Sequence, residues 1–166
     1  MRSAARAPRA AAAPLSNLPA SFEGTLPCAD CAGIDYHLDL FADGVFFLRQ
    51  QYRGRPGEFD DIGRWAPSSD GELISLHGGR EAPLRFQVLG PDELRLMDQD
   101  GQPIESELDY SLRRSDDFAP IEPRLNLRGM YSYLADAALF TECLTGRRMP
   151  VAMEADNRAL ERAYLE

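Results

Sequence analysis

Apolar and polar residues alternate along much of the chain between residues 20 and 114. The clearest case is residues 34–40, where the even positions are apolar and the odd positions are polar or charged. Such alternation is typical of a β-strand with one buried face and one solvated face. Residues 45–48 are instead continuously apolar, which predicts a strand that is covered on both faces.

Turn signals rich in Gly, Pro and Asp separate these runs and give each of them the length of a strand. Together they predict eight strands, at residues 20–26, 34–41, 45–53, 58–66, 72–77, 83–89, 93–98 and 105–114. Sequential strands joined by hairpins close most simply into an up-and-down barrel, which leaves no sheet edge exposed. The predicted fold is therefore all-β, with a small antiparallel barrel over residues 20–115.

The apolar faces of these strands supply the side chains that we expect to be largely buried inside the barrel. They are Ile34, Leu38, Leu40, Phe47, Trp65, Phe86, Val88, Leu96, Leu108 and Tyr110.

The rest of the chain divides into a flexible tail at residues 1–19, a linker at residues 116–124 and a second unit at residues 125–166. The sequence of the second unit predicts further strands, a Thr145-Gly146 turn and a short helix after Asp156. A unit of this size rarely buries enough surface to fold alone. We therefore expect it to be loosely ordered, docked on the barrel or exchanged with a neighbouring chain in a dimer.

Charge and composition narrow the possible functions. The formal net charge is −9, whereas a surface that follows phosphates needs clustered positive charge, so no nucleic-acid partner is expected. All 18 basic residues are arginine, which excludes lysine chemistry such as Schiff-base formation. The sequence contains no nucleophile elbow and no zinc-protease helix, so we expect a protein that is not an enzyme. It also has no apolar run long enough to cross a bilayer as a helix.

The candidate chemistry lies in Cys28 and Cys31, which are separated by two residues between the first two predicted strands. In an oxidising compartment the pair can form a disulfide, and when reduced it can offer two thiolates to a soft metal such as Cu(I). Both alternatives stay open. His37 could be a third ligand, although a solvated histidine on the polar face of its strand is favoured. A structural zinc site is disfavoured because it would need four ligands.

Motifs across the first unit resemble the signature of the NlpE copper-resistance lipoproteins, a family of outer-membrane proteins linked to envelope stress. The segments that carry the resemblance are residues 24–34, 43–44, 52–54, 63–65, 96–98, 100–101 and 108–113. The second unit is similar to the start of the OB-type domain of that family. Its matching segments are residues 128–131, 135–138, 140–143, 145–148 and 160–165.

The resemblance implies a lipocalin-like barrel followed by a partial OB-type segment with one short helix. It also implies a location at the periplasmic face of the outer membrane, with a lipid anchor upstream of Ser16. Family members are linked to copper tolerance and to the Cpx envelope-stress sensor kinase, so copper and that kinase are the expected cofactor and partner. Cys143 would pair with a cysteine beyond Glu166, so we expect an unpaired thiol here.

Three hypotheses of function follow. The first is a non-enzymatic envelope lipoprotein for copper tolerance and Cpx-type signalling, with Cys28 and Cys31 as a soft-metal and redox site. The second is a lipocalin-like periplasmic carrier that holds a small apolar ligand inside its barrel. The third, which we favour least, is a periplasmic thiol–disulfide enzyme.

Overall fold

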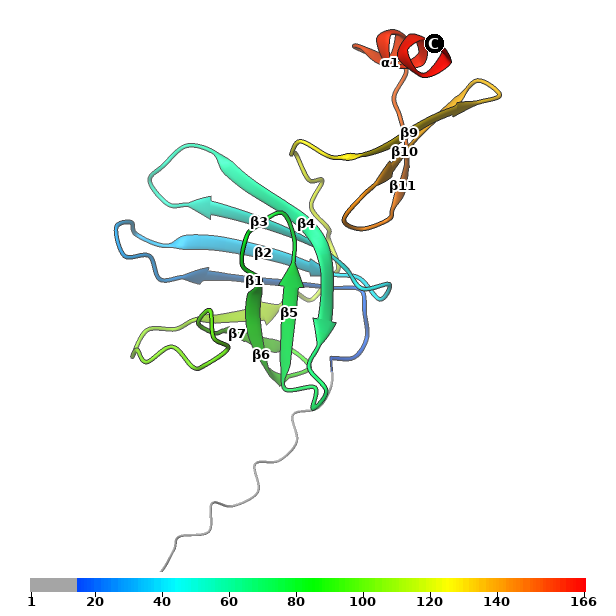
Figure 1. Cartoon of the computed structure of the whole chain (residues 1–166). Coiled ribbons are helices and arrows are strands. Elements are labelled where there is room, and N and C mark those ends of the chain that lie inside the picture. The colour runs from blue at the N-terminus through cyan, green and yellow to red at the C-terminus, as the bar shows by residue number, and fades with distance from the viewer. Residues whose placement is uncertain (1–14) are drawn as a thin grey trace, which may run out of the picture.

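The computed structural model describes residues 15–166, and its first part is a closed antiparallel barrel in which each strand pairs with the next (Figure 1). Strands β1 and β8 close the barrel through two residue pairs, Phe22 with Arg114 and Glu23 with Arg113. The predicted fold class is confirmed. The barrel strands are β1 (Ala20–Leu26), β2 (Ile34–Leu40), β3 (Val45–Tyr52), β4 (Glu58–Pro67), β5 (Leu73–His77), β6 (Leu84–Gly90), β7 (Glu93–Leu96) and β8 (Ser111–Arg114).

The predicted tail at residues 1–19 needs a correction at its end. Leu15 and Leu18 pack against the hydrophobic core, and the Arg114 guanidinium donates hydrogen bonds to the backbone carbonyls of Ser16 and Asn17. The chain is thus already attached to the barrel before β1 begins. Residues 1–14 lie outside the part that the structure describes.

The register of the strands directs one set of side chains into the barrel. Phe22 lies opposite Leu38 on β2, which in turn lies opposite Leu48 on β3, and all three are fully buried. An eight-stranded barrel is only wide enough for its own side chains, so these residues fill it. The remaining large members of the core are Leu26, Tyr36, Leu40, Phe46, Ile74, Leu76, Phe86, Val88, Leu94 and Leu112.

Of the ten predicted core residues, four are buried, three are partly buried against the core and three lie outside it. Leu38, Leu40, Phe86 and Val88 are buried, and Ile34, Trp65 and Leu96 are partly buried against the core. Phe47 is half-buried on the outer face of β3, because its neighbours Phe46 and Leu48 occupy the inner face. The ring of Phe47 packs there at 4.9 Å from that of Phe41, so β3 is covered on both faces as predicted.

The predicted burial of Leu108 and Tyr110 is wrong because the last strand is shorter than predicted. Strand β8 begins only at Ser111, which leaves Leu108 59% exposed and Tyr110 half-buried. The hydroxyl of Ser106 accepts a hydrogen bond from the backbone N–H of Leu108, and the Asp109 carboxylate accepts one from that of Ser111. Such local side-chain bonds stabilise turns in competition with a sheet ladder.

The predicted linker is an ordered strap that lies on the outer face of the barrel. We call residues 116–124 the strap. Backbone N–H groups of Ile121 and Arg124 donate hydrogen bonds to the carboxylates of Asp39 and Asp60, at 2.9 and 2.7 Å. The guanidinium of Arg49 bonds the carbonyl of Glu122 at 3.0 Å. The strap therefore spans β2, β3 and β4 before the second unit begins.

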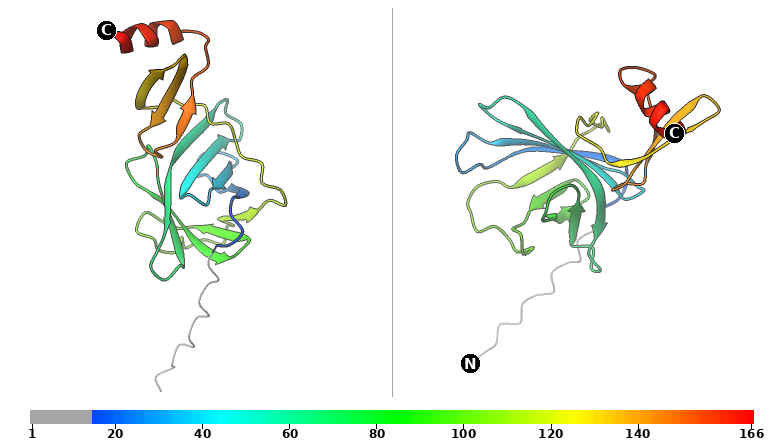
Figure 2. Two further views of the ribbon diagram at one scale, coloured as in Figure 1. Left: turned by 90° about the vertical axis from the view of Figure 1, so that its right-hand side faces the viewer. Right: turned by 45° about the horizontal axis from the view of Figure 1, so that its top comes forward.

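The second unit is a three-stranded sheet with a helix on the side away from the barrel (Figure 2). Its order is β11 (Arg148–Pro150), β10 (Ala137–Glu142), β9 (Gly129–Leu134), and α1 spans Asn157–Leu165. The unit is docked on the barrel, which is one of the three expected arrangements. The Arg64 guanidinium donates to the carbonyl of Thr145 at 2.6 Å. That of Arg147 lies 4.1 Å from the centroid of the Phe41 ring, a cation–π contact.

The core assignment predicts a large difference between two leucine substitutions. Leu38→Ala should lower the free energy of unfolding by about 2–5 kcal/mol, because Leu38 is fully buried in the barrel. Leu108→Ala should change it by no more than about 0.5 kcal/mol, since that side chain is exposed. Urea unfolding followed by tryptophan fluorescence measures both values, and equal losses would contradict the assignment.

Candidate functional site

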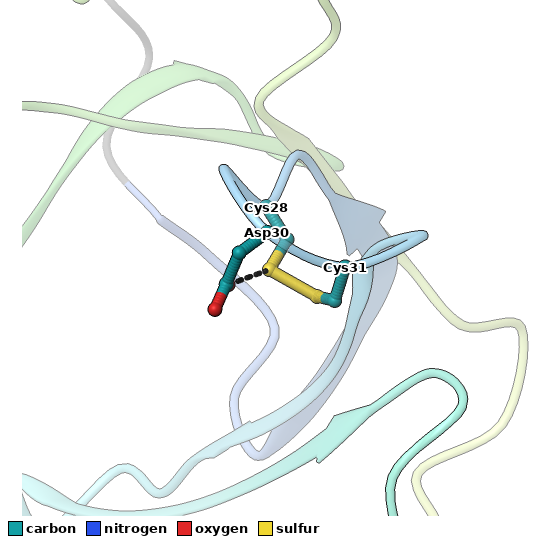
Figure 3. Close-up of side chains that lie close together, drawn as sticks. All are labelled: Cys28, Asp30 and Cys31. Atoms are coloured by element: carbon teal, nitrogen blue, oxygen red, sulfur yellow. Dashed lines mark hydrogen bonds between the residues drawn. A yellow bond between two sulfur atoms is a disulfide. The ribbon is translucent and has the colours of Figure 1, made fainter.

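The cysteine pair lies in the loop that joins β1 and β2 at one rim of the barrel. Cys28 and Cys31 form a disulfide there, with their Cα atoms 5.3 Å apart, and both are half-buried (Figure 3). Gly33 ends the loop with a φ of +149°. A Cβ atom at Gly33 would approach the methyl carbon of Thr25 to 2.7 Å. The backbone N–H of Arg53 then bonds the Gly33 carbonyl at 2.9 Å, which attaches the loop to the end of β3.

Asp30 brings a carboxylate beside the disulfide. Its Oδ1 lies 3.4 Å from the Sγ of Cys28, the contact drawn in Figure 3. The disulfide sulfur carries no hydrogen, so this contact becomes a hydrogen bond only when Cys28 is a thiol. The Arg55 guanidinium donates to the other oxygen of Asp30 at 2.7 Å. That hydrogen bond, followed by the charge of Arg55, lowers the pKa of Asp30 and keeps the carboxylate ionised.

Cys28, Asp30 and Cys31 form the group whose potential ligand atoms all lie within 4.8 Å of one another. The oxidised pair has no thiolate to offer, so the disulfide itself does not fit a metal ion. Reduction would turn the same two sulfurs into adjacent soft donors, which suit Cu(I) and its low coordination number. The site therefore has two mutually exclusive chemical states, a disulfide and a soft dithiolate.

His37 is half-buried on the outer face of its strand and lies outside the group formed by Cys28, Asp30 and Cys31. Its Nδ1 lies 2.8 Å from an oxygen of Glu23, and its Nε2 lies 2.9 Å from Oδ1 of Asp39. The hydrogen bond with Asp39 is the main cause of a raised pKa for His37, and burial opposes it. The imidazole thus joins two carboxylates on the outer face of β1 and β2, apart from the cysteine group.

Asp39 is the buried centre of this outer face, and the sequence analysis did not single it out. Its side chain is fully buried and accepts hydrogen bonds from the Ser21 hydroxyl at 2.6 Å and the backbone N–H of Ile121 at 2.9 Å. Burial of a carboxylate is tolerated only when hydrogen bonds replace its water. In the sequence, Asp39 is simply a polar residue on the outward face of a predicted strand, a position where solvated acids are common, so nothing indicates its burial.

Cys143 is exposed at the end of β10 and makes no disulfide with any residue from 15 to 166. Beside it, the carboxylate of Glu142 is buried and accepts hydrogen bonds from the backbone N–H groups of Leu144 and Thr145, at 2.8 and 2.7 Å. These bonds build the Thr145-Gly146 turn, in which Gly146 has a φ of +71°. The turn presents the Thr145 carbonyl to Arg64 and so belongs to the docking contact.

Two family models match the chain in the order of its two units. The NlpE N-terminal domain matches residues 22–107, and the NlpE C-terminal OB domain matches residues 121–166. The chain belongs to the NlpE family. The family resemblance and the OB-type assignment of the second unit are both confirmed.

The relatives extend this result to individual proteins. Lipoprotein NlpE from Escherichia coli K12 is 41% identical over 159 residues, which cover 94% of this chain and 64% of that protein. The crystal structure of the Cpx pathway activator NlpE from E. coli is 39% identical and has a TM-score of 0.46, covering 89% of this chain and 75% of the other. A solved Shewanella oneidensis protein is 32% identical with a TM-score of 0.52, covering 60% and 90%. The chain thus spans just under two thirds of the length of E. coli lipoprotein NlpE.

Within residues 15–166, no helix has the length and apolar character that would let it span a bilayer.

The contacts of His37 predict a stability that depends on pH. A histidine whose pKa is higher in the folded state stabilises that state at low pH, and the effect disappears as the pH rises through the folded pKa. Because the pKa of His37 is raised above 6.5, His37→Gln should cost about 1 kcal/mol at pH 6 and clearly less at pH 9. Urea unfolding at both pH values measures the difference.

His77→Gln is the matched control, because His77 is exposed on β5. Its effect on the free energy of unfolding should be small, because within residues 15–166 the exposed side chain makes no contact that the substitution removes. A His37→Gln effect that grows with pH would contradict the assigned contacts.

Proposed function

We propose that this chain is part of an envelope lipoprotein that reports stress to a sensor kinase of the Cpx type. Its place is the periplasmic face of the outer membrane, with a lipid anchor attached through the segment upstream of Ser16. Family membership and 41% identity to E. coli lipoprotein NlpE support this role. The E. coli protein is named a Cpx pathway activator in its solved structure. The role is signalling, without an enzymatic reaction.

Cys28 and Cys31 are the proposed sensory site, and the observation that carries this part is their disulfide at an accessible rim. Opening the bond takes two electrons and two protons from a dithiol donor, which itself becomes a disulfide. The resulting thiols lose their protons when they bind Cu(I). Oxidation and copper binding use the same sulfur atoms, so the loop responds to both the thiol balance and the copper level.

The loop can change state without opening the barrel. The disulfide closes a ring of only four residues, and the loop-entropy relation gives it at most about 2 kcal/mol of stabilisation. The side chains that fill the barrel lie elsewhere, and Cys28 and Cys31 are outside the core cluster. Reduction therefore alters the rim while the rest of the molecule keeps its fold.

The other two hypotheses have weaker support. A carrier of a purely apolar ligand needs an empty apolar interior, whereas the core side chains of this barrel fill it. A thiol–disulfide enzyme lowers the pKa of its attacking cysteine, commonly at a helix N-terminus. The cysteine loop here joins two strands, and α1, the single helix of residues 15–166, lies in the other unit.

The metal hypothesis predicts a specific loss of Cu(I) binding. In the presence of a phosphine reductant, Cys28→Ser and Cys31→Ser should each weaken Cu(I) binding by about 100-fold or more, because one thiolate is lost. Titration against a bathocuproine competitor measures the affinity. Oxidised wild-type protein should not compete for the ion.

Cys143→Ser is the matched control, since it removes a cysteine thiol that lies in the other unit. It should leave the affinity unchanged. Undiminished Cu(I) affinity in Cys28→Ser, or an equal loss in Cys143→Ser, would refute the assignment of the metal to this loop.

The signalling proposal is tested with the full-length lipidated protein in a strain that lacks its own NlpE and carries a Cpx-responsive reporter. Raised expression should increase reporter activity, and copper should increase it further in the wild type only. Cys28→Ser should keep the first response and lose the second. An absent first response would overturn the signalling role, whereas loss of the copper response alone bears on the cysteine site.

A further inference from the structure

The barrel interior is apolar in one half and polar and aromatic in the other. The inward-facing positions of β3 run from Phe46 and Leu48, which are apolar and buried, to Gln50 and Tyr52. Gln50 lies opposite Phe59 on β4, so these residues share the inner face. The change of character coincides with the point where β4 continues past β5, since only residues 64–67 of β4 pair with that strand. Figure 1 shows the β3–β4 hairpin extending beyond the shorter strands.

A pocket of about 330 Å³ opens at this end of the barrel, which we call the mouth. Gln50, only 3% exposed, is its most deeply buried residue. The lining residues are Gln50, Tyr52, Arg55, Pro56, Phe59 and Arg80.

Two aromatic rings form an apolar wall of the mouth. The rings of Tyr52 and Phe59 meet edge to face with their centroids 5.6 Å apart. The guanidinium of Arg55 lies 6.0 Å from the centroid of the Tyr52 ring, although Asp30 already neutralises its charge. Phe59 is 57% exposed, which is high for a phenylalanine in a strand. A ligand with an aromatic or short apolar body would cover this exposed ring.

Arg80 brings a second guanidinium to the mouth, where it forms an ion pair with the carboxylate of Asp61. The Asp61 carboxylate accepts a hydrogen bond from the backbone N–H of Gly79 at 2.8 Å and lies 3.6 Å from Nε of Arg80. A Cβ atom at Gly78 would collide with that carboxylate, so the loop after β5 can approach Asp61 only with glycine there.

The N–H groups of Arg80 remain open to a ligand. Among residues 15–166 no hydrogen-bond acceptor is within bonding distance of this guanidinium, whose nearest carboxylate is the 3.6 Å contact with Asp61. Burial raises the pKa of the Tyr36 hydroxyl on the inner face of β2, and the charge of Arg80 opposes that rise. A planar guanidinium with unused donors is suited to a carboxylate, sulfonate or phosphate group.

We propose that the mouth binds a small organic anion with an aromatic or short apolar body. The acidic group bonds the Arg80 guanidinium, and the body lies against Phe59 and Tyr52. Gln50 closes the floor of the pocket, and beyond it the filled apolar half of the barrel leaves no space for a long chain. The size of the pocket limits the length of the ligand, and the N–H donors of Arg80 that make no hydrogen bond favour an acidic group. This site does not rest on the signalling or copper proposals.

The experiment uses two fluorescent probes of similar shape and different charge. The anionic probe 1-anilinonaphthalene-8-sulfonate should bind the folded wild-type protein with saturation. The neutral N-phenyl-1-naphthylamine should bind about 10-fold more weakly, because it cannot bond the guanidinium. Amide shifts in ¹H–¹⁵N spectra should concentrate in residues 50–59 and 78–80.

Arg80→Gln should weaken binding of the anionic probe by about 10-fold and leave the neutral probe unchanged. Arg158→Gln is the matched control, since it removes the same charge from an exposed position on α1 and should change nothing. Phe59→Ala should weaken both probes, and thermal unfolding checks that each variant is folded. The proposal is overturned if the anion does not bind at millimolar concentration, if both probes bind equally, or if Arg158→Gln loses as much affinity as Arg80→Gln.

Discussion

The narrow interior of an eight-stranded barrel is the constraint on which the rest of this structure depends. The barrel's own side chains are enough to fill such an interior, and here fourteen buried residues form its core. Chemistry therefore has to lie where the filling stops or on the outside. The disulfide loop occupies the rim, the Gln50 pocket lies at the mouth, and the outer face carries the strap and the second unit.

The sequence predicts the fold well because alternating apolar and polar residues distinguish the buried face of a strand from its solvated face. The even positions of β2 are predicted inward and prove to be so, since Tyr36, Leu38 and Leu40 are buried. The same logic fails where several apolar residues follow one another, because periodicity cannot choose between Phe46 and Phe47. It fails again at Leu108, where hydrogen bonds to Ser106 and Asp109 favour turns over the last strand. The strap could not be predicted, because its partners Asp39 and Asp60 look like ordinary solvated acids in the sequence.

In the candidate site, too, the sequence predicts local features but not contacts between distant segments. The spacing of Cys28 and Cys31 identifies a local unit, but it leaves both a disulfide and a metal site open, since the redox compartment decides between them. Contacts between distant segments cannot be predicted from residue spacing, because they depend on the register of the strands. The pairing of Asp61 with the loop at Gly79 requires the β4–β5 register, and the place of His37 between Glu23 and Asp39 requires that of β1 and β2.

The strap has a mechanical consequence. It connects the two units and is held by backbone hydrogen bonds at Ile121 and Arg124 and by the Arg49 contact with Glu122, spaced along its length. Tension on the second unit would load these bonds one after another. The strap would therefore detach at the force that breaks a single bond, not at the force that breaks all of them together. Beyond Arg124 and Glu122 the pull would reach the bond between Ile121 and Asp39, and then the bond between Ala119 and the Ser21 hydroxyl. A pull from the far end of the molecule would thus free one oxygen of the Asp39 carboxylate, while the other oxygen keeps its bonds to Ser21 and His37.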